Sequence, residues 1–374
     1  MRIIIAPDKY KGSLTAKEAC EAIRKGIKDI YPETETIELP MADGGNGTAF
    51  ILAEASGGKM ISCNVHDPLN RIISSSFGIS GDGKTAFVEM AAASGIQLLL
   101  PEERNCFYTS TFGTGELILA AMNKAAQKII LCIGGSATND AGIGMAAALG
   151  YQFMDSDDNL LEPIGKNLQF IHRIDDSNAH TSLRKIEFEV ACDVDNPLAG
   201  PNGAAWIYGP QKGANECELR QLNKGLEQFA FVVQEKYSVS VLNIPGSGAA
   251  GGLGAGAIIF LHAKLRRGIE IVLNFLCFEK LLKSSNLIIT GEGKLDSQSL
   301  NGKVIQGIAQ LAAAYKIPVI AIAGSVELTE DEIQKCGLFK TYSITREGTP
   351  LEIAIKEASA NLRSTAGKMA LENF

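Results

Sequence analysis

The stretch of residues 287–303 combines, in one short segment, side chains that suit phosphate chemistry. Residues 287–290 are an apolar run with two isoleucines, which predicts a buried strand. Apolar residues recur at helical spacing from Val304 onward, so a glycine-rich polar loop is predicted to connect a strand to a helix. An ordinary solvated loop is the alternative. The loop offers two carboxylates, two lysines and two hydroxyls: Glu292, Asp296, Lys294, Lys303, Ser297 and Ser299.

Other polar loops follow predicted strands and carry side chains of the same kinds. Phosphoryl transfer uses donors for the phosphoryl oxygens, a carboxylate for the hydroxyl proton and another for Mg²⁺. Ligands of open α/β sheets bind at the carboxyl ends of strands, so each loop is a candidate site. The loops are residues 7–13 after the strand 2–6, residues 43–48 after 36–41, residues 134–142 after 128–133, and Asp193 with Asp195 after 186–192.

A glycine-rich loop at residues 246–256 matches the dinucleotide-binding fingerprint weakly. Gly246, Gly248 and Gly251 have the G-x-G-x-x-G spacing, and a strand is predicted before them. The loop is richer in glycine than such a turn needs, and it lies far from the first strand–helix unit. Backbone amides that approach a phosphate are therefore favoured over NAD binding. Tight packing of small residues against a neighbouring helix is the structural alternative.

Several other chemistries are disfavoured. Ser136 lies in a GGSAT segment that is not a nucleophile elbow, and none of the four histidines has an acyl-transfer context. Gly302 and Lys303 lack the remainder of a Walker A motif. The eight cysteines are scattered without a CxxC pair, so zinc, iron–sulfur and disulfide frameworks are poorly supported.

Length and charge limit the function further. A chain of 374 residues predicts two domains. The net charge of −7, without a long basic run, disfavours a nucleic-acid or membrane partner. The apolar run at the N-terminus is too short for a signal peptide, and the cysteine usage fits a reducing compartment, so we expect a cytoplasmic protein.

The two ends of the chain share one pattern and the middle has another. Strand–loop–helix units recur near both termini, with capping boxes at Thr15/Glu18 and Thr329/Glu332. The middle begins with antiparallel strands around an Asp82-Gly83 turn, and its strand 186–192 is expected to be half-exposed. We predict an α/β protein: a doubly wound (Rossmann/flavodoxin-like) parallel-sheet domain from residues 1–61 and 284–374, and an inserted α/β domain of mixed sheet from residues 62–283.

Seven motifs in one order make the whole chain resemble the class I glycerate kinases. They are APDKYKGS at residues 6–13, MADGGNGT at 41–48, DPLNR at 67–71, EMAAASG at 89–95, GGSATND at 134–140, YGPQKGA at 208–214 and GEGKLD at 291–296. Two departures are mild. Asn46 stands where the family often has Glu, and Lys294 where Arg is common.

The resemblance implies a two-domain kinase with its active site in the cleft between the domains. It implies phosphorylation of D-glycerate by ATP with Mg²⁺, by direct in-line transfer. The product is expected to be phosphoglycerate, with the 2-isomer favoured and the 3-isomer open. A NAD-dependent oxidoreductase of a small hydroxy acid and a non-catalytic nucleotide-binding protein are the alternative functions. The sequence leaves open whether the chain forms a homo-oligomer.

Within this reading, each loop has an expected role and a structural alternative. Asp296 is the first choice for the base, with a helix N-cap as its alternative. Arg71 either binds the substrate or closes a hairpin, and Asp140 is expected to cap a helix. The expected catalytic residues are Asp296, Asp43, Asp193 and Lys9, with Asp193 and Asp43 also as metal ligands. The expected substrate-binding residues are Asp8, Lys11, Ser13 and Arg71. The expected nucleotide or phosphate contacts are Gly134, Gly135, Ser136, Thr138, Gly248, Gly251, Gly252, Lys212 and Lys303.

Overall fold

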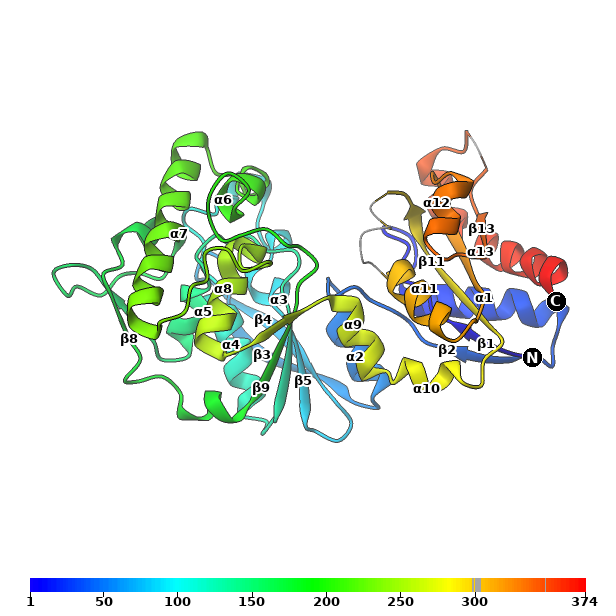
Figure 1. The fold of residues 1–374 in the computed structure, drawn as a ribbon, viewed down its shortest axis with the longest axis horizontal. Coiled ribbons are helices and arrows are strands. Elements are labelled where there is room, and N and C mark those ends of the chain that lie inside the picture. Colours follow the sequence, from blue (N-terminus) through cyan, green and yellow to red (C-terminus); the bar gives the residue numbers. More distant parts are fainter. Residues whose placement is uncertain (298, 300–303, 347) are drawn as a thin grey trace. The chain divides into compact units, whose positions relative to one another are not determined.

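The chain folds into two compact units, shown in Figure 1. A computed structural model describes residues 1–297, 299, 304–346 and 348–374. Unit 1 comprises Met1–Asp43 and Ile269–Phe374, and unit 2 comprises Gly44–Gly268. Unit 1 is thus built from both ends of the chain, with unit 2 inserted between them.

Unit 1 is a doubly wound parallel sheet. All four strand pairings are parallel, in the order β13-β12-β11-β1-β2. Numbered within the unit this order is the flavodoxin-like 2-1-3-4-5, which confirms the predicted fold class. Its elements are β1 (Arg2–Ile5), α1 (Ala16–Ile30), β2 (Glu35–Glu38), α9 (Gly268–Phe275), α10 (Phe278–Leu282), β11 (Leu287–Leu295), α11 (Val304–Ala314), β12 (Val319–Val326), α12 (Glu330–Lys335), β13 (Lys340–Ser343) and α13 (Leu351–Asn373).

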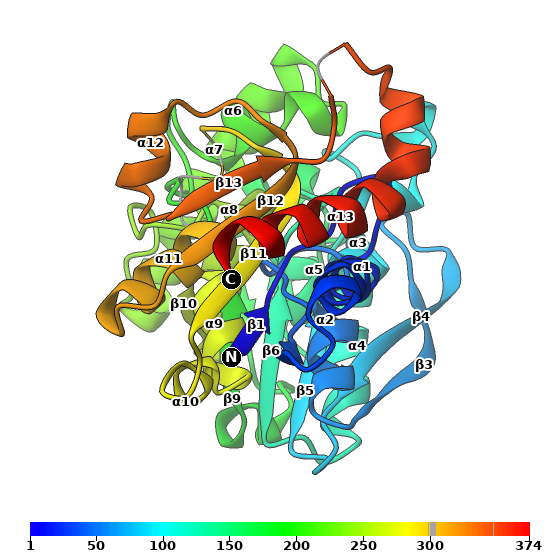
Figure 2. The same cartoon turned by 90° about the vertical axis from the view of Figure 1, so that its right-hand side faces the viewer.

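Helices α1 and α13 cover one face of the unit 1 sheet (Figure 2). Ile23 and Ile27 of α1 and Leu362 of α13 are fully buried in one cluster with the strand residues Ile5 and Ile289. The predicted capping boxes are confirmed at α1 and α12, where the Thr15 and Thr329 side chains accept from the amides three residues on. Local signals and burial therefore agree on where these helices begin.

Strand β11 is longer than the sequence suggests. A glycine-rich loop is expected from Gly291, yet the strand continues to Leu295. The reason is its partner β12, which pairs with it in register from Ile288↔Val319 to Leu295↔Val326. Side chains alternate along a strand, so Glu292 and Lys294 share one face of this extension.

Unit 2 contains a mixed six-stranded sheet in the order β10-β9-β6-β5-β4-β3, as predicted. The neighbouring pairs among β10, β9, β6 and β5 are parallel. The pairs β5–β4 and β4–β3 are antiparallel. The helices and strands of the unit are α2 (Thr48–Ala55), β3 (Lys59–His66), β4 (Ile72–Ile79), β5 (Thr85–Glu89), α3 (Ala91–Ser94), α4 (Phe112–Met122), β6 (Lys128–Cys132), α5 (Ile143–Ala148), β7 (Gln152–Met154), β8 (Arg173–Asp175), β9 (Glu187–Ala191), α6 (Ala204–Tyr208), α7 (Glu216–Tyr237), α8 (Ala249–Leu261) and β10 (Lys264–Arg266). The 3-10 helices are η1 (Ile96–Leu98), η2 (Pro101–Glu103), η3 (Gly165–Phe170), η4 (Thr181–Lys185) and η5 (Pro210–Lys212).

The boundaries between the units differ from residues 61 and 284. Helix α2 packs on β3, β4 and β5, so it belongs to unit 2 although it follows a unit 1 strand. At the other boundary, Ile269 lies against Gly307 of α11, so α9 belongs with unit 1. In both places the tertiary partner of a helix, and not its neighbour in the chain, decides its unit.

The strand expected to be half-exposed, β9, is mostly buried. Phe188 and Val190 are buried on one side, and Glu189 is only 6% exposed on the other. Glu189 is kept as a charge by Lys128 and Arg266, at 2.8 and 3.1 Å. An alternating apolar and acidic pattern does not require solvent when the neighbouring strands supply cations.

Two further properties concern the whole described chain. All eight cysteines are free thiols. Within the described residues, no helix is both long enough and apolar enough to cross a bilayer.

Candidate functional site

In unit 1, β1 ends beside Ile289 of the neighbouring strand β11, which continues to Leu295. These neighbours are the strands at which the strand order reverses, the position where doubly wound sheets bind ligands. The loop after β1 continues along β11, since the Asp8 amide donates to the Gly291 carbonyl at 2.8 Å. Tyr10 is buried, and its hydroxyl donates to the Ile322 carbonyl at 2.5 Å. A Cβ at Gly291 would lie 2.5 Å from that hydroxyl, so the glycine is what lets the loop approach.

Asp8 is a buried carboxyl group at this edge with a strongly raised pKa. It is 9% exposed, and burial is the main reason that its pKa rises to about 7. The negative charge of Asp43 raises the pKa further, and Glu292 adds a smaller contribution of the same sign. The Lys9 amide, which donates to Asp8 Oδ1 at 2.7 Å, opposes these effects. A carboxyl group that titrates near neutrality can exchange a proton at working pH.

Asp296 follows the last residue of β11. Its carboxylate lies 3.6 Å from Lys294 Nζ, which also pairs with Glu327 at 2.8 Å. Helix α11 is described from Val304, and residues 300–303 before it lie outside the described residues, so both the catalytic role and the N-cap alternative for Asp296 stay predictions.

Lys9, Lys11 and Ser13 of the 7–13 loop differ in solvent exposure and in hydrogen bonding. The Lys11 side chain is exposed, whereas Lys9 is half-buried. The Ser13 hydroxyl donates to the Tyr10 carbonyl at 3.1 Å, which is the behaviour of a turn residue. Of the cations on this loop, Lys11 is thus the one most accessible to an anionic substrate.

In unit 2, the glycine loop at residues 44–47 lies at the carboxyl edge of the parallel strands. A Cβ at Gly44 would lie 2.7 Å from the Ala191 Cβ and 3.2 Å from the Gly268 Cα, and Gly134 lies close to Gly45. Asp193, just after β9, accepts from the Gly268 amide at 2.8 Å. The ends of β6, β9 and β10 are thereby brought together with this loop.

Glu89, the last residue of β5, anchors the same loop and was not among the expected site residues. Its Oε1 accepts from the amides of Gly47 and Ala49 at 2.9 and 2.8 Å. Gly47 is the N-cap of α2 and has no side chain with which to cap it, so Glu89 caps the helix from a distant strand. Its position at a strand end, in one of the seven motifs, is the signal that could have identified it.

The loop after β6 has an exposed part and a buried part. Gly134 and Gly135 are exposed, and Gly135 has a φ of 77°. Ser136 and Thr138 are buried, and the Lys212 amine donates to Ser136 Oγ at 2.6 Å. An incoming phosphate could therefore reach the two glycines without any rearrangement of the loop.

Asp140 binds amides at the starts of two helices, although it is not the N-cap residue itself: α4 has Thr111 and α5 has Gly142 at that position. Its carboxylate accepts from the Thr111 amide and hydroxyl at the start of α4, and from the Gly142 and Gly144 amides at the start of α5. Burial raises the pKa of Asp140, and these four donors oppose the increase. The Asp140 carboxyl group therefore already occupies the N-terminus of α5, which leaves the exposed glycines as the phosphate-accessible part.

The glycine loop at residues 246–252 is a packing element. The Gly248 amide donates to the Asn196 carbonyl at 3.0 Å. The Gly252 amide donates to the Gly248 carbonyl at 3.2 Å. A Cβ at Gly251 would lie 2.1 Å from the Thr138 carbonyl oxygen. No strand precedes the loop, since residues 238–248, all of them described, form only turns and irregular backbone. The expected strand is thus wrong, and the dinucleotide interpretation loses its structural basis.

Arg71 is engaged by two carboxylates. Its guanidinium contacts Asp67 and Glu103, each at 2.6 Å, while Asp67 also accepts from the Leu69 and Arg71 amides. This is the hairpin-closing arrangement left open by the sequence. Lys303, by contrast, lies outside the described residues.

The carboxylates do not form a ready-made metal cluster. Within residues 1–297, 299, 304–346 and 348–374, no group of three or more His, Cys, Asp or Glu side chains could hold a metal ion. Mg²⁺ in phosphoryl-transfer enzymes typically takes one or two carboxylates and completes its shell with phosphate oxygens and water. Single carboxylates such as Asp43 and Asp193 fit that mode.

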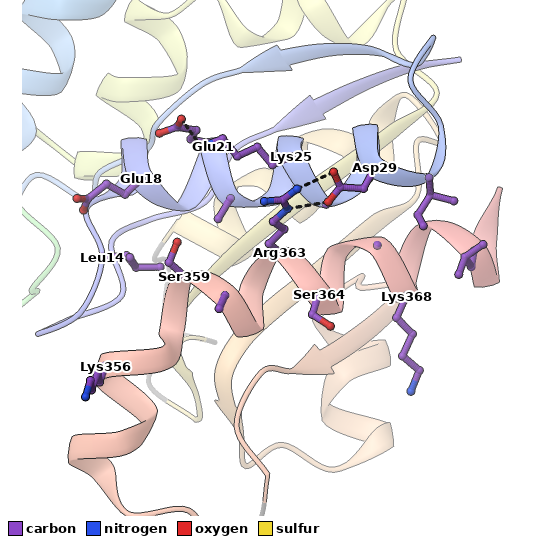
Figure 3. A pocket seen from close by; sticks show the side chains of 16 residues that line it. Leu14, Glu18, Glu21, Lys25, Asp29, Lys356, Ser359, Arg363, Ser364 and Lys368 are labelled. Carbon is purple, nitrogen blue, oxygen red and sulfur yellow. Dashed lines mark hydrogen bonds and ion pairs between the residues drawn. The ribbon is translucent and has the colours of Figure 1, made fainter.

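A groove of about 1020 Å³ between α1 and α13 contains none of these residues (Figure 3). Arg363 is paired across it with Asp29 at 2.6 and 2.7 Å. Lys25 is likewise paired with Glu21 at 2.7 Å. The groove lies on a helical face of the sheet and not at the strand ends, so we do not assign the reaction to it.

Comparisons with known proteins agree over the whole chain. The model of the glycerate kinase family matches residues 3–372. A glycerate kinase of Bacillus cereus is 46% identical over 370 residues, covering 99% of this chain and 97% of the relative. A glycerate 2-kinase of Escherichia coli is 44% identical over 375 residues, covering 99% and 98%. The crystal structure of a protein assigned as glycerate kinase 2 from Salmonella typhimurium LT2 superposes with a TM-score of 0.91 at 43% identity, covering 100% of this chain and 98% of the other.

Proposed function

The chain belongs to the glycerate kinase family, and on this premise we propose that it transfers the terminal phosphoryl group of ATP to a hydroxyl of D-glycerate. The family membership makes it a kinase that acts on glycerate. We further propose 2-phosphoglycerate as the product, because a relative of 44% identity is named glycerate 2-kinase. The observation that best supports the chemistry is the carboxylate group around Asp8 at the strand-order reversal of unit 1.

Unit 1 is proposed to handle the acceptor alcohol. A buried carboxylate that titrates near neutrality can accept the hydroxyl proton as the new O–P bond forms, and Asp8 meets this requirement. Asp43 adjusts the pKa of Asp8 through its charge, and Asp296 stays a candidate for the same task. The exposed amine of Lys11 is proposed to bind the glycerate carboxylate.

Unit 2 is proposed to bind phosphate. The exposed backbone at Gly134 and Gly135 lets phosphate oxygens approach the amides closely, and the Ser136 hydroxyl adds a donor beside them. Such positioned donors stabilise the charge of the transferring phosphoryl group. The Gly248–Gly252 segment, which is packed internally, is proposed to support this loop and not to contact the nucleotide.

Mg²⁺ would neutralise phosphate charge and orient the terminal phosphoryl group. Asp43 of unit 1 and Asp193 of unit 2 are each proposed as a carboxylate ligand for Mg²⁺. Asp193 already has one oxygen in a hydrogen bond to the Gly268 amide, which fixes the direction of the carboxylate. Asp43 is near enough to Asp8 to raise the pKa of that residue, and a cation would offset this repulsion.

The test of the function is substrate-dependent ADP formation. Purified protein with Mg-ATP and D-glycerate should release ADP, whereas NAD with D-glycerate should give no NADH. Formation of NADH would favour the oxidoreductase alternative. Nucleotide binding without ADP formation from any small hydroxy acid would favour the non-catalytic alternative.

A further inference from the structure

A lysine buried in unit 2 joins two segments that lie far apart in the sequence. Lys212 ends the 3-10 helix η5, and its side chain is 3% exposed. Its carbonyl accepts from the Cys106 amide at 3.0 Å. A Cβ at the next residue, Gly213, would lie 1.8 Å from the Arg104 carbonyl oxygen, so the backbone is held tightly against the 104–106 segment. The backbone at Lys212 is therefore closely packed against this segment.

The amine of Lys212 ends at the loop after β6. It donates to the Ser136 hydroxyl at 2.6 Å and to the Thr138 carbonyl at 2.7 Å. Both acceptors lie within three residues of Gly135, which with Gly134 forms the exposed part of the proposed phosphate site. Because Lys212 is buried, its amine contacts the loop from the interior of the unit. A nucleotide phosphate approaching from solvent would meet the two exposed glycines first, and Ser136 is the next residue in the chain.

The two hydrogen bonds place the positive charge of Lys212 next to Ser136 and Thr138 of the loop after β6. Burial lowers the pKa of Lys212 to about 8, and the nearby Cys106 and Asp140 oppose this shift. At neutral pH the amine is therefore mostly an ammonium group with two bonds to the loop. A hydroxyl can accept and donate at once, so Ser136 can accept from Lys212 and still donate its own proton. Donation from a hydroxyl that already accepts from a cation is strengthened.

We propose that Lys212 is a positioning residue for phosphate binding, which fixes residues 134–138 and polarises the Ser136 hydroxyl without touching the nucleotide. This assignment rests on the proposed use of ATP. It replaces the expectation that Lys212 contacts the nucleotide directly. The chemical class of the ligand is a nucleoside triphosphate, bound through its phosphates at Gly134, Gly135 and Ser136.

The assignment predicts a dependence of nucleotide affinity on pH. As pH rises through about 8, Lys212 loses its proton and the ammonium that polarises Ser136 is lost, so affinity should fall. Of the two charged or titratable groups near the amine, Cys106 stays a thiol in this range because burial raises its pKa to about 11. Asp140 is held by its four donors and is unchanged in every variant proposed below.

The experiment measures binding of a non-hydrolysable ATP analogue with Mg²⁺ at pH 7 and pH 9, by calorimetry. Wild-type affinity should fall about tenfold between these pH values. Lys212→Met should bind at least tenfold more weakly at pH 7 and show no further loss at pH 9. Lys224→Met removes an exposed lysine of α7 in the same unit and should match the wild type. In turnover assays, Lys212→Met should raise KM for ATP and leave KM for glycerate unchanged.

Two outcomes would overturn the assignment. One is a Lys212→Met variant with wild-type affinity and the wild-type pH dependence. If that variant does not fold, Ser136→Ala decides, because it removes only a hydroxyl: wild-type affinity with wild-type pH dependence would overturn the proposal. A wild type that binds the analogue in this pH-dependent manner but forms no phosphoglycerate from ATP and glycerate would overturn the proposed reaction and leave the role of Lys212 standing.

Discussion

The two units present different chemistry at the carboxyl ends of their parallel strands. In unit 1 carboxylates gather there, and Asp8 titrates near neutrality because it is buried beside Asp43. In unit 2 the same edge is made of glycines and a hydroxyl, and the buried side chains of Lys212 and Asp140 are held by hydrogen bonds. The edge of unit 1 therefore has a carboxyl group that can exchange a proton. The edge of unit 2 has neutral hydrogen-bond donors that can bind an anion.

Glycine content alone does not identify a phosphate-binding loop. Within unit 2, residues 134–135 and 246–252 are both glycine-rich, but only the first pair is exposed at a strand end. The second follows no strand and packs against the backbone at Thr138 and Pro197. Position relative to the sheet separates a binding loop from a packing loop.

The largest expected effect concerns the carboxylate edge of unit 1. Asp8→Asn should lower kcat by roughly 10³-fold, within the range that general-base catalysis contributes. In the wild type, kcat/KM should rise as pH increases through about 7, since Asp8 must lose its proton to act as a base. Asp43→Asn should move this rise to lower pH, because it removes the second cause of the raised pKa. Steady-state kinetics from pH 5 to 9 give both results.

Asp8→Asn should raise the stability of the protein, although it lowers activity. The native pKa of Asp8 is about 7 against an ordinary value of 3.8, so the ionised form destabilises the fold above pH 7 and the cost disappears as pH falls towards 4. Asp8→Asn should therefore stabilise the protein at pH 8 by up to about 4 kcal/mol and have little effect at pH 4. Urea unfolding at the two pH values checks the sign. A destabilised variant at pH 8 would contradict the account.

The packing loop of unit 2 is expected to give the next largest effect. Gly251→Ala introduces a Cβ 2.1 Å from the Thr138 carbonyl oxygen at a φ of 71°, and should cost about 3 kcal/mol of unfolding free energy or more. Gly83 has the same φ with open space around it, so Gly83→Ala is a matched control and should cost about 1 kcal/mol. Equal losses in the two variants, measured by chemical denaturation, would show that the loop is not tightly packed.

Glu89 tests how the glycine loop at residues 44–47 is held. Glu89→Ala removes the acceptor for the Gly47 and Ala49 amides and should cost about 2 kcal/mol. Glu89→Gln keeps a carbonyl acceptor and should cost less than half as much. Thermal unfolding of both variants measures the difference. If Gln is as damaging as Ala, the hydrogen bonds are not what anchors the loop.

The smallest effect should be seen at the exposed glycine of the phosphate loop. A Cβ at Gly134 would meet nothing closer than the Gly45 Cα at 3.4 Å, so Gly134→Ala should change stability by less than about 1 kcal/mol. Its methyl group should still hinder close approach of a phosphate and raise KM for ATP about tenfold. An unchanged KM would place the phosphate elsewhere and weaken the contrast between the two glycine loops.

The sequence predicted those features that depend on local pattern. The capping boxes at Thr15 and Thr329, the parallel sheet from both termini and the Asp82-Gly83 turn between β4 and β5 all follow from residue type and spacing. The family resemblance follows from motif order along the chain. None of these depends on knowing which distant segments touch.

The features that were missed depend on partners far away in the sequence. Strand β11 extends beyond Thr290 because β12 pairs with it, and α2 joins unit 2 because it packs on β5. The burial of Lys212 against Ser136 joins residues 76 apart, so no local pattern marks it. The raised pKa of Asp8 likewise depends on burial and on the charges of Asp43 and Glu292, which are far from it in the sequence.

The central claim is that this chain phosphorylates glycerate. The most direct measurement is phosphorus and carbon-13 NMR of a reaction containing the protein, Mg-ATP and carbon-13-labelled D-glycerate. The account predicts ADP together with a phosphate monoester coupled to C2 of glycerate. Absence of any phosphoglycerate signal, from protein shown to be folded and to bind the nucleotide, would contradict it.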